Sequence, residues 1–313
     1  MLGKTAGGLF WMFRYLERSE NAARLLEAGF RIALTRSATA SAEWKSILTT
    51  SGSLDDYDAR HNDYDSGNVI NFMLRNHRNP ASVLSNVKAA RDNARLVRTA
   101  LTREVWEATN ESWINLNALL ANPVRDRDLP DVLRAIRQQK AVVRGAMAGT
   151  MLRNDGYNFA RLGMFLERAD NTARILDVKY YLLLPSFAQV GSSLDHVQWD
   201  TILHSVSAHR AYHWLNGADI SAINVADFLI LHPQMPRSLA FCTQKLTDNL
   251  GYLEREYGEE NEACRMAKAQ FQRLRRGKID EIFEHGLHEF VQGFLQSNAA
   301  LAAQIEHDYR FYE

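Results

Sequence analysis

Apolar side chains recur at intervals of three and four residues along most of the chain, which is the spacing of helices that bury one face. Two long stretches of this kind predict helices over residues 7–35 and 157–184. Shorter stretches predict helices over residues 42–50, 80–100, 131–153, 196–215, 221–231, 237–257, 260–275 and 279–312, and another that begins after Thr102. Alternating β-branched runs joined by Asn-Gly or Asp-Gly turns are lacking. The pattern predicts an all-α protein, a large helical bundle made of two pseudo-repeated bundles that share the two long helices at their interface.

Turn-forming residues separate the predicted helices. The polar run 55–67 is expected to be the most flexible loop of the first half. Asn79 is expected to cap the helix that follows it, with Pro80 at the first helical position. Thr102 is expected to cap the next one.

The length of 313 residues suits one large domain or two closely packed domains. Pro185 ends the second long helix, and the loop after it is the place for a soft boundary. We expect an N-terminal helical bundle over residues 1–184, which contains both long helices. A C-terminal bundle over residues 185–313 is expected to pack against it, with a single domain as the alternative.

The two long predicted helices contain the same motif. The segment YLERSENAARLLE begins at Tyr15, and FLERADNTARILD begins at Phe165, so the offset is 150 residues without a gap. In each copy the glutamate, asparagine and second arginine follow the i, i+4, i+7 spacing and share one helix face. The motif residues are Glu17, Arg18, Asn21 and Arg24 in the first copy and Glu167, Arg168, Asn171 and Arg174 in the second.

Three interpretations of this polar face stay open. It can be a solvated face with ordinary ion pairs, which are worth about 0 to 1 kcal/mol each. It can be a buried network that locks two equivalent helices together. It can also be a pocket between two facing stripes, in which the arginines hold an anionic group, because the planar guanidinium binds a carboxylate or phosphate through two hydrogen bonds. The repeated asparagine, a poor helix former, favours one of the last two.

A third helix carries a weaker echo of the motif. Arg91, Asn93 and Arg95 lie in the predicted helix 80–100, where the arginines share one side. A solvated basic face is one interpretation. The other is a third wall of the same pocket, so these residues join the candidate ligand-binding set.

The overall charge excludes some classes of partner. With 37 basic and 37 acidic side chains, no net field draws the chain to nucleic acid or to a membrane surface. The apolar run near the N-terminus is interrupted too early for a signal peptide, and no stretch approaches a membrane span. Cys242 and Cys264 lack metal or redox spacing and are expected to be core thiols in a reducing cytoplasm.

Candidate catalytic and metal-binding groups are weak. His209 and His213 stand one helical turn apart, but Arg210 occupies the place of a metalloprotease glutamate. A C-terminal run pairs Glu281 with His285 and Glu284 with His288, an incomplete di-iron pattern. We therefore expect no metal and no cofactor.

No nucleophile motif is present, and no phosphate-binding glycine loop. Glu17 and Glu167 could act as an acid and base pair if burial separated their pKa values. The neighbouring Arg18 and Arg168 favour the ionised form of both, so we read the glutamates as fixed anions. The catalytic residues, if there are any, cannot be named from the sequence.

The sequence resembles the alpha-E family, an all-helical bacterial domain with a Glu-Arg motif. The resemblance rests on the paired LERxxNxxR segments, on ARDNARLVR at 90–98 with EVWE at 104–107, and on FLILHP at 228–233 with PRS at 236–238. Asp92 stands where the family more often has glutamate. The resemblance covers nearly the whole chain.

The resemblance implies association with circularly permuted ATP-grasp ligases, often beside transglutaminase-like and proteasome-like peptidases, in peptide synthesis or modification. The function expected first is therefore a noncatalytic helical partner that binds an anionic peptide, an aminoacyl group or the ligase itself through the paired motifs. An enzyme that uses paired carboxylates or a metal is the second expectation, and a purely structural scaffold is the third. The sequence does not indicate the oligomeric state.

Overall fold

The computed structural model describes residues 1–35, 40–183 and 193–312, and every regular element in these ranges is a helix. The α-helices are α1 (Gly3–Thr35), α2 (Ala40–Ser51), α3 (Leu54–Asp58), α4 (Ser66–Arg75), α5 (Val83–Leu96), α6 (Arg103–Leu119), α7 (Leu129–Thr150), α8 (Asp155–Leu183), α9 (Ser193–Ser205), α10 (His209–Asn216), α11 (Ala222–Ile230), α12 (Leu239–Tyr257), α13 (Glu262–Arg276), α14 (Ile279–His285) and α15 (Leu287–Asp308). Two 3-10 helices are η2 (Arg98–Ala100) and η3 (Asp126–Asp128). The prediction of an all-α bundle is confirmed.

Two local predictions in the first half were wrong. The polar run 55–67 is not simply a loop, because it holds most of α3 and the start of α4. The cap of α5 is Ser82, whose hydroxyl accepts a hydrogen bond from the Ser85 amide at 3.2 Å. Asn79 instead accepts from the Ala81 amide at 2.9 Å and forms a turn before the helix. Thr102 caps α6 as expected.

Two predicted helices of the second half are each broken in two. The helix expected over 196–215 divides into α9 and α10 at Ser207, whose φ is 55°. The helix expected over 279–312 divides into α14 and α15 at Gly286, whose φ is 100°. A right-handed helix cannot pass through a positive φ, so the helix ends at each of these residues and a new one begins after it. The expected boundary after residue 184 lies outside the described residues and stays a prediction.

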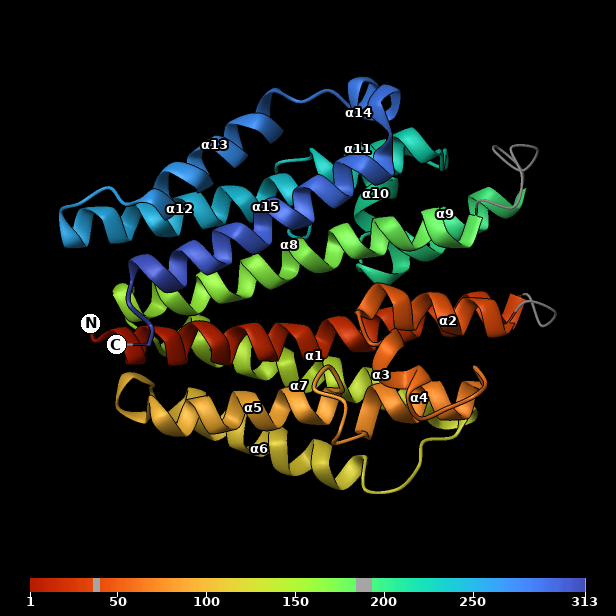
Figure 1. Cartoon of the computed structure of the whole chain (residues 1–313), viewed down its shortest axis with the longest axis horizontal. Helices are drawn as coiled ribbons and strands as arrows, with labels where there is room; N and C mark the ends of the chain where they lie inside the picture. The colour runs from red at the N-terminus through yellow and green to blue at the C-terminus, as the bar shows by residue number, and fades with distance from the viewer. Residues whose placement is uncertain (36–39, 184–192, 313) are drawn as a thin grey trace.

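Helices α1 and α8 run side by side through the middle of the molecule (Figure 1). They are parallel, since the Met1 ammonium pairs with Asp155 at 3.2 Å at their first turns and Asn21 meets Glu167 halfway along. Helix α1 packs against α5 and α7, and α8 packs against α12 and α15. The central pair is thus covered on both sides by equivalent helices.

The two sides of the bundle are copies of each other. The segment EWKSILTTSGS at 43–53 matches QWDTILHSVSA at 198–208, with an offset of 155 residues. The segment NFMLRNHRNPAS at 71–82 matches DFLILHPQMPRS at 227–238, with an offset of 156. Because the first helix pair is offset by 150, the copies differ only by short insertions.

Matching side chains make matching hydrogen bonds in the two copies. The buried Tyr57 donates to the carbonyl of Asp63 at 2.9 Å, and the buried Tyr212 donates to the carbonyl of Asp219 at 2.7 Å. The turn after α2 has a positive φ at Gly52, as the turn after α9 has at Ser207. The chain is therefore an internal duplication, with α1 to α7 answered by α8 to α15.

A glycine lets the two central helices touch. A Cβ atom on Gly163 of α8 would lie 2.1 Å from the carbonyl oxygen of Phe10 on α1. Real Cβ atoms do not approach a backbone oxygen so closely, so only glycine permits this contact. The close approach brings the two motif faces within direct hydrogen-bonding reach.

Among the described helices, none is both long and apolar enough to cross a membrane.

Candidate functional site

The two Glu-Arg motifs bind each other reciprocally at the α1–α8 contact. Arg18 donates two hydrogen bonds to the Glu167 carboxylate, at 2.6 and 2.9 Å. Arg168 donates two to the Glu17 carboxylate, at 2.8 and 3.2 Å. Both glutamates are buried. The geometry is a forked guanidinium–carboxylate pair repeated about an approximate twofold axis parallel to the helices.

The second arginine of each motif crosses to the other copy. Arg24 binds the carbonyl of Ser205, at the end of α9, at 3.1 Å. Arg174 binds the carbonyl of Thr50, near the end of α2, at 3.3 Å. Ser205 and Thr50 occupy matching positions in the duplicated segments. Each arginine therefore anchors the end of a helix that belongs to the other repeat.

The side of the contact around Glu17 is closed by additional cations. Arg237, from the loop before α12, lies 3.3 Å from Glu17 and 2.9 Å from Glu20. Arg144 of α7 pairs with Glu20 as well. We call this side the closed half, defined by the residues Glu17, Glu20, Arg24, Lys140, Arg144, Arg168 and Arg237.

The cations decide the protonation of the buried acids in the closed half. Burial raises the pKa of Glu17, but Arg168 and Arg237 outweigh burial and hold this pKa below its usual value. The pKa of Glu20 is lowered as well, because Arg237 and then Arg24 overcome its burial. Burial, reinforced by neighbouring Arg24, lowers the pKa of Arg237 to about 9, which still leaves it charged at neutral pH.

The other side of the contact holds a cavity of about 290 Å³. We call it the open half, defined by Arg14, Arg18, Glu167, Asp170 and Arg174. The remaining lining residues are Asn21, Ala22, Leu25, Thr50, Ser51, Met73, Ala81, Asn171, Asn298 and Ala299. The side chains of Arg18 and Arg174 are 34% and 41% exposed, so the cavity opens to solvent past them.

Substitutions between the two copies explain why one half is open. Ala81 in the Pro-Ala-Ser turn before α5 matches Arg237 in the Pro-Arg-Ser turn before α12. Asn298 and Ala302 of α15 match Lys140 and Arg144 of α7, because the buried residues of these two helices align with an offset of 158. The three long cationic side chains that fill the closed half are thus replaced by two alanines and an asparagine.

The absence of these cations affects the pKa values of the acids in the open half. Burial raises the pKa of Asp170, the counterpart of Glu20, and the charge of Glu167 adds to the effect although Arg174 opposes it. The pKa of Glu167 is lowered despite its burial, by Arg18 and then Arg14. One acid of the open half therefore lacks the compensation that its counterpart receives.

Four residues that line the cavity each have a buried polar atom without a hydrogen-bond partner among the described residues: Asn21 Oδ1, Thr50 Oγ1, Asn171 Nδ2 and Asn298 Oδ1. Two amide orientations are fixed, since Asn21 Nδ2 donates to the carbonyl of Glu167 and Asn298 Nδ2 to that of Leu166, each at 3.1 Å. Their Oδ1 atoms consequently remain as acceptors. An unpaired buried polar atom is costly. The two Oδ1 atoms call for a donor on a guest, and Asn171 Nδ2 calls for an acceptor.

The third wall expected from α5 needs correction. Arg91 donates to Asn110 of α6 at 2.8 Å, Asn93 bonds to the carbonyl of Ala89 in its own helix at 2.9 Å, and Arg95 is exposed. None of the three lines the cavity, because the face of α5 that meets α1 is apolar. The wall of the open half comes instead from Thr50, Ala81 and Asn298.

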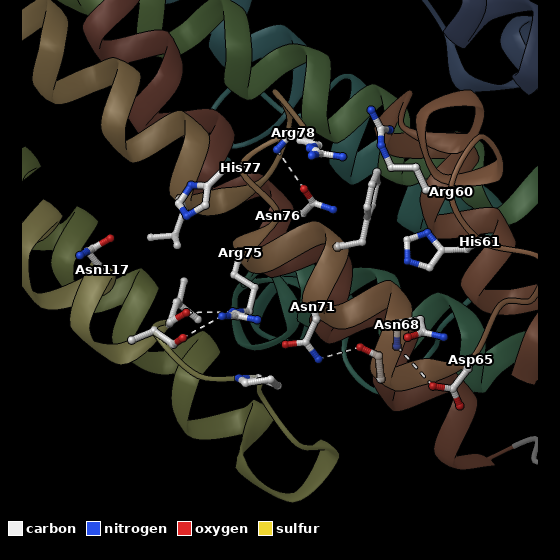
Figure 2. Close-up of a pocket in the computed structure, with 16 residues that line it drawn as sticks. Arg60, His61, Asp65, Asn68, Asn71, Arg75, Asn76, His77, Arg78 and Asn117 are labelled. Atoms are coloured by element: carbon white, nitrogen blue, oxygen red, sulfur yellow. Dashed lines mark hydrogen bonds between the residues drawn. The ribbon is translucent and has the colours of Figure 1, made fainter.

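A second hollow, of about 1030 Å³, lies between α4 and the end of α6. Figure 2 shows that two of its polar side chains, Arg75 and Asn71, are hydrogen-bonded to nearby backbone. Arg75 donates to the carbonyls of Leu120 and Ala121 at 3.0 and 2.7 Å, and Asn71 donates to that of Gly67 at 2.7 Å. Arg75 thus caps the end of α6, and no motif residue lines this hollow.

The C-terminal acid–histidine run does not form one site. Gly286 places His285 in α14 and His288 in α15. His288 Nδ1 lies 2.6 Å from Asp177 Oδ1 of α8, while His285 Nδ1 bonds to the carbonyl of Glu281 at 2.7 Å. The thiol of Cys242 is buried, which raises its pKa to about 12. The two histidines are therefore not arranged as ligands of one metal ion, and the protonated thiol of Cys242 is not arranged as a nucleophile.

Arg237 and Arg144 were not among the site residues predicted from the sequence, although the paired Pro-x-Ser turns at 80–82 and 236–238 carried a signal for Arg237. Comparisons of the chain with curated proteins and with solved structures give no match. A family model described as "a predicted alpha-helical domain with a conserved ER motif" matches residues 1–310. The reciprocal pairs at Glu17-Arg18 and Glu167-Arg168 give that motif its geometry, and the chain belongs to the Alpha-E family.

Proposed function

We propose that the open half binds a small guest that carries both a cationic and an anionic group, such as an amino acid, an aminoacyl group or the end of a peptide. One observation carries the proposal. In the closed half the guanidinium of Arg237 rests against two carboxylates, and in the open half Ala81 leaves the matching place beside Glu167 and Asp170 to a guest. An ammonium or guanidinium group of the guest would complete this half as Arg237 completes the other.

The lining atoms support both ends of such a guest. The acceptors Asn21 Oδ1 and Asn298 Oδ1 suit a donor-rich cation beside the two carboxylates. Arg18 and Arg174 lie at the exposed side of the cavity. Their guanidinium groups already pair with Glu167 and Asp170, so a guest carboxylate would bind through the N–H groups that these pairs leave over. A volume of 290 Å³ falls at the small end of ligand pockets, which favours a single residue over a longer segment.

We further propose that the chain acts as a noncatalytic partner of a circularly permuted ATP-grasp ligase in bacterial peptide synthesis or modification, with transglutaminase-like and proteasome-like peptidases as further partners. The family resemblance is the support for this role. Lowered pKa values of Glu17 and Glu167 argue against a general acid among the motif carboxylates. The two free, buried cysteines suit a reducing cytoplasm.

The Ala81→Arg variant tests the binding site directly. We expect the new guanidinium to occupy the cavity as Arg237 occupies the closed half, and to compete with the guest. Calorimetric titration with L-arginine, L-lysine, L-glutamate and the dipeptides of these residues should show binding to the wild type, and at least about tenfold weaker binding to the variant. Ala118→Arg adds the same charge at an exposed position of α6 and serves as the control.

Three outcomes would count against the proposal. Equal affinity of the wild type and Ala81→Arg would place the guest elsewhere, and no binding of any of these probes would reject the guest class. Turnover of a probe by the purified chain without a ligase would favour the enzyme alternative. Co-purification of the ligase with the wild type and with Ala81→Arg tests whether the partner role depends on the cavity. If the ligase co-purifies with the wild type but not with the variant, the two are linked.

A further inference from the structure

Imidazole and carboxylate groups from α9 and α10 form a cluster next to the turn at Ser207. Its residues are Asp200, His204, His209 and His213. His209 Nε2 lies 3.1 Å from Asp200 Oδ1 and 3.1 Å from His213 Nε2. His204 stacks on the ring of His209 with 4.2 Å between centroids, and its Nε2 lies 3.6 Å from Asp200 Oδ2. We propose that Asp200, His209 and His213 bind a divalent transition metal ion of the zinc type.

The spacing of the three groups suits one ion. Each offers a ligand atom, and these atoms lie within 4.8 Å of one another. Ligands about 2.0 to 2.1 Å from a tetrahedral zinc ion stand about 3.3 Å apart, close to the two separations of 3.1 Å. Nitrogen and carboxylate ligands in this combination are ones that zinc uses. Three protein ligands at a half-exposed site leave the fourth position to water.

One ligand is already held in the form that a metal needs. The Nδ1 atom of His213 is hydrogen-bonded to the carbonyl of Gly217. A carbonyl only accepts, so Nδ1 carries the proton and the lone pair lies on Nε2, which faces His209 and Asp200. A backbone carbonyl in this role is the usual outer partner of a metal-binding histidine.

The duplication shows that the fold does not need these side chains. In the first copy the positions of Asp200, His204 and His209 are occupied by Lys45, Thr49 and Leu54, and the turn still forms with a positive φ at Gly52. A packing role would be served by the same residues in both copies. The second copy has instead gathered three imidazoles and a carboxylate around one point.

The turn that carries the cluster is fixed by the first motif. Arg24 donates to the Ser205 carbonyl at 3.1 Å and to the Ser207 hydroxyl at 2.6 Å, and Glu20 holds the same guanidinium at 2.6 Å. The helix ends of α9 and α10 are therefore preorganised against α1. This proposal revises the expectation of no metal, which weighed His209 and His213 without Asp200.

Titration of the chelator-treated chain with Zn²⁺ tests the proposal. We expect one equivalent to bind with micromolar or tighter affinity, and Co²⁺ to give the visible absorption of a four-coordinate ion. His213→Asn should weaken Zn²⁺ binding at least about 100-fold, because a ligand is lost outright. The exposed His307, changed to asparagine, is the control and should leave binding unchanged.

A second variant guards against misfolding. Asp200→Lys with His204→Thr copies residues that the first copy tolerates, so the helices should form, as circular dichroism would show, while Zn²⁺ binding is lost. Wild-type protein that takes up no Zn²⁺ equivalent would overturn the proposal. The proposal would also be overturned if the double variant or His213→Asn bound Zn²⁺ with the affinity of the wild type.

Discussion

The closed and open halves begin with the same motif and end with different chemistry. In both, an arginine from one central helix forks onto a glutamate of the other. In the closed half Arg237 and Arg144 add two more guanidinium groups to the buried acids. In the open half Ala81 and Ala302 stand at the matching positions, and Ala81 lines a cavity.

The difference separates two roles that a duplicated motif can have. The closed half is a buried network in which both glutamates are paired with guanidinium groups, so its role is to lock α1 to α8. The open half retains the same lock but exposes its outer edge and leaves polar atoms without partners. The closed half can therefore be compared directly with the open half. The cationic group of Arg237, which the closed half contains and the open half lacks, indicates the chemistry of the guest.

The largest effect is expected from Arg237→Ala. The substitution leaves Glu17 and Glu20 buried with fewer cations than they need, and breaking a buried charge network in this way costs about 3 to 5 kcal/mol of unfolding free energy. Urea denaturation followed by circular dichroism would measure it. The matching Ala81→Arg should change the unfolding free energy by less than about 1 kcal/mol, and a large loss there would contradict the comparison.

A second effect concerns Lys140, whose counterpart in the open half is Asn298. Burial lowers the pKa of Lys140 to about 7, against 10.5 for the exposed side chain. Between these values the unfolded chain binds a proton that the folded chain does not, so stability rises with pH across this window and the penalty is complete below it. Lys140→Met removes the penalty.

Stability of the Lys140→Met variant should exceed that of the wild type by a few kcal/mol at neutral pH, on the order of the free energy of the pKa shift. The gain should shrink as the pH approaches 10. Denaturation curves at several pH values would check both statements. A constant difference between the two proteins at all pH values would show that Lys140 is already charged in the folded chain.

The sequence predicted the helices and the motif pair because both leave local, periodic signals. The gapless offset of 150 made Glu17 and Glu167 comparable, and the spacing of Asn21 and Arg24 placed them on one face. Helix ends were harder, because Asn79 and Ser82 are both good caps and only the backbone conformation decides between them.

The difference between the halves could not be predicted from the motif alone. Arg237 matches Ala81 at an offset of 156, whereas Arg144 matches Ala302 at 158, so a search at the offset of 150 passes over both. Tertiary packing brings these residues to the glutamates from helices that the motif does not name. For the same reason Asp200 did not appear beside His209 until the Ser207 turn folded α10 back.

The smallest and most specific effect distinguishes the two motif asparagines. Asn21 donates to the carbonyl of Glu167 at 3.1 Å, while the matching amide nitrogen of Asn171 has no partner among the described residues. Asn21→Ala should therefore cost about 1 kcal/mol of unfolding free energy, and Asn171→Ala less than about half as much, because no hydrogen bond is lost. Each variant removes an unpaired polar atom from a residue that lines the cavity, so both should bind the amino-acid probes more weakly. Asn171→Ala is expected to lose this affinity while it keeps its melting temperature. Thermal unfolding and calorimetry on the same samples measure both quantities, and an Asn171→Ala protein that is destabilised as much as Asn21→Ala, with its affinity intact, would mean that this asparagine serves packing in both copies.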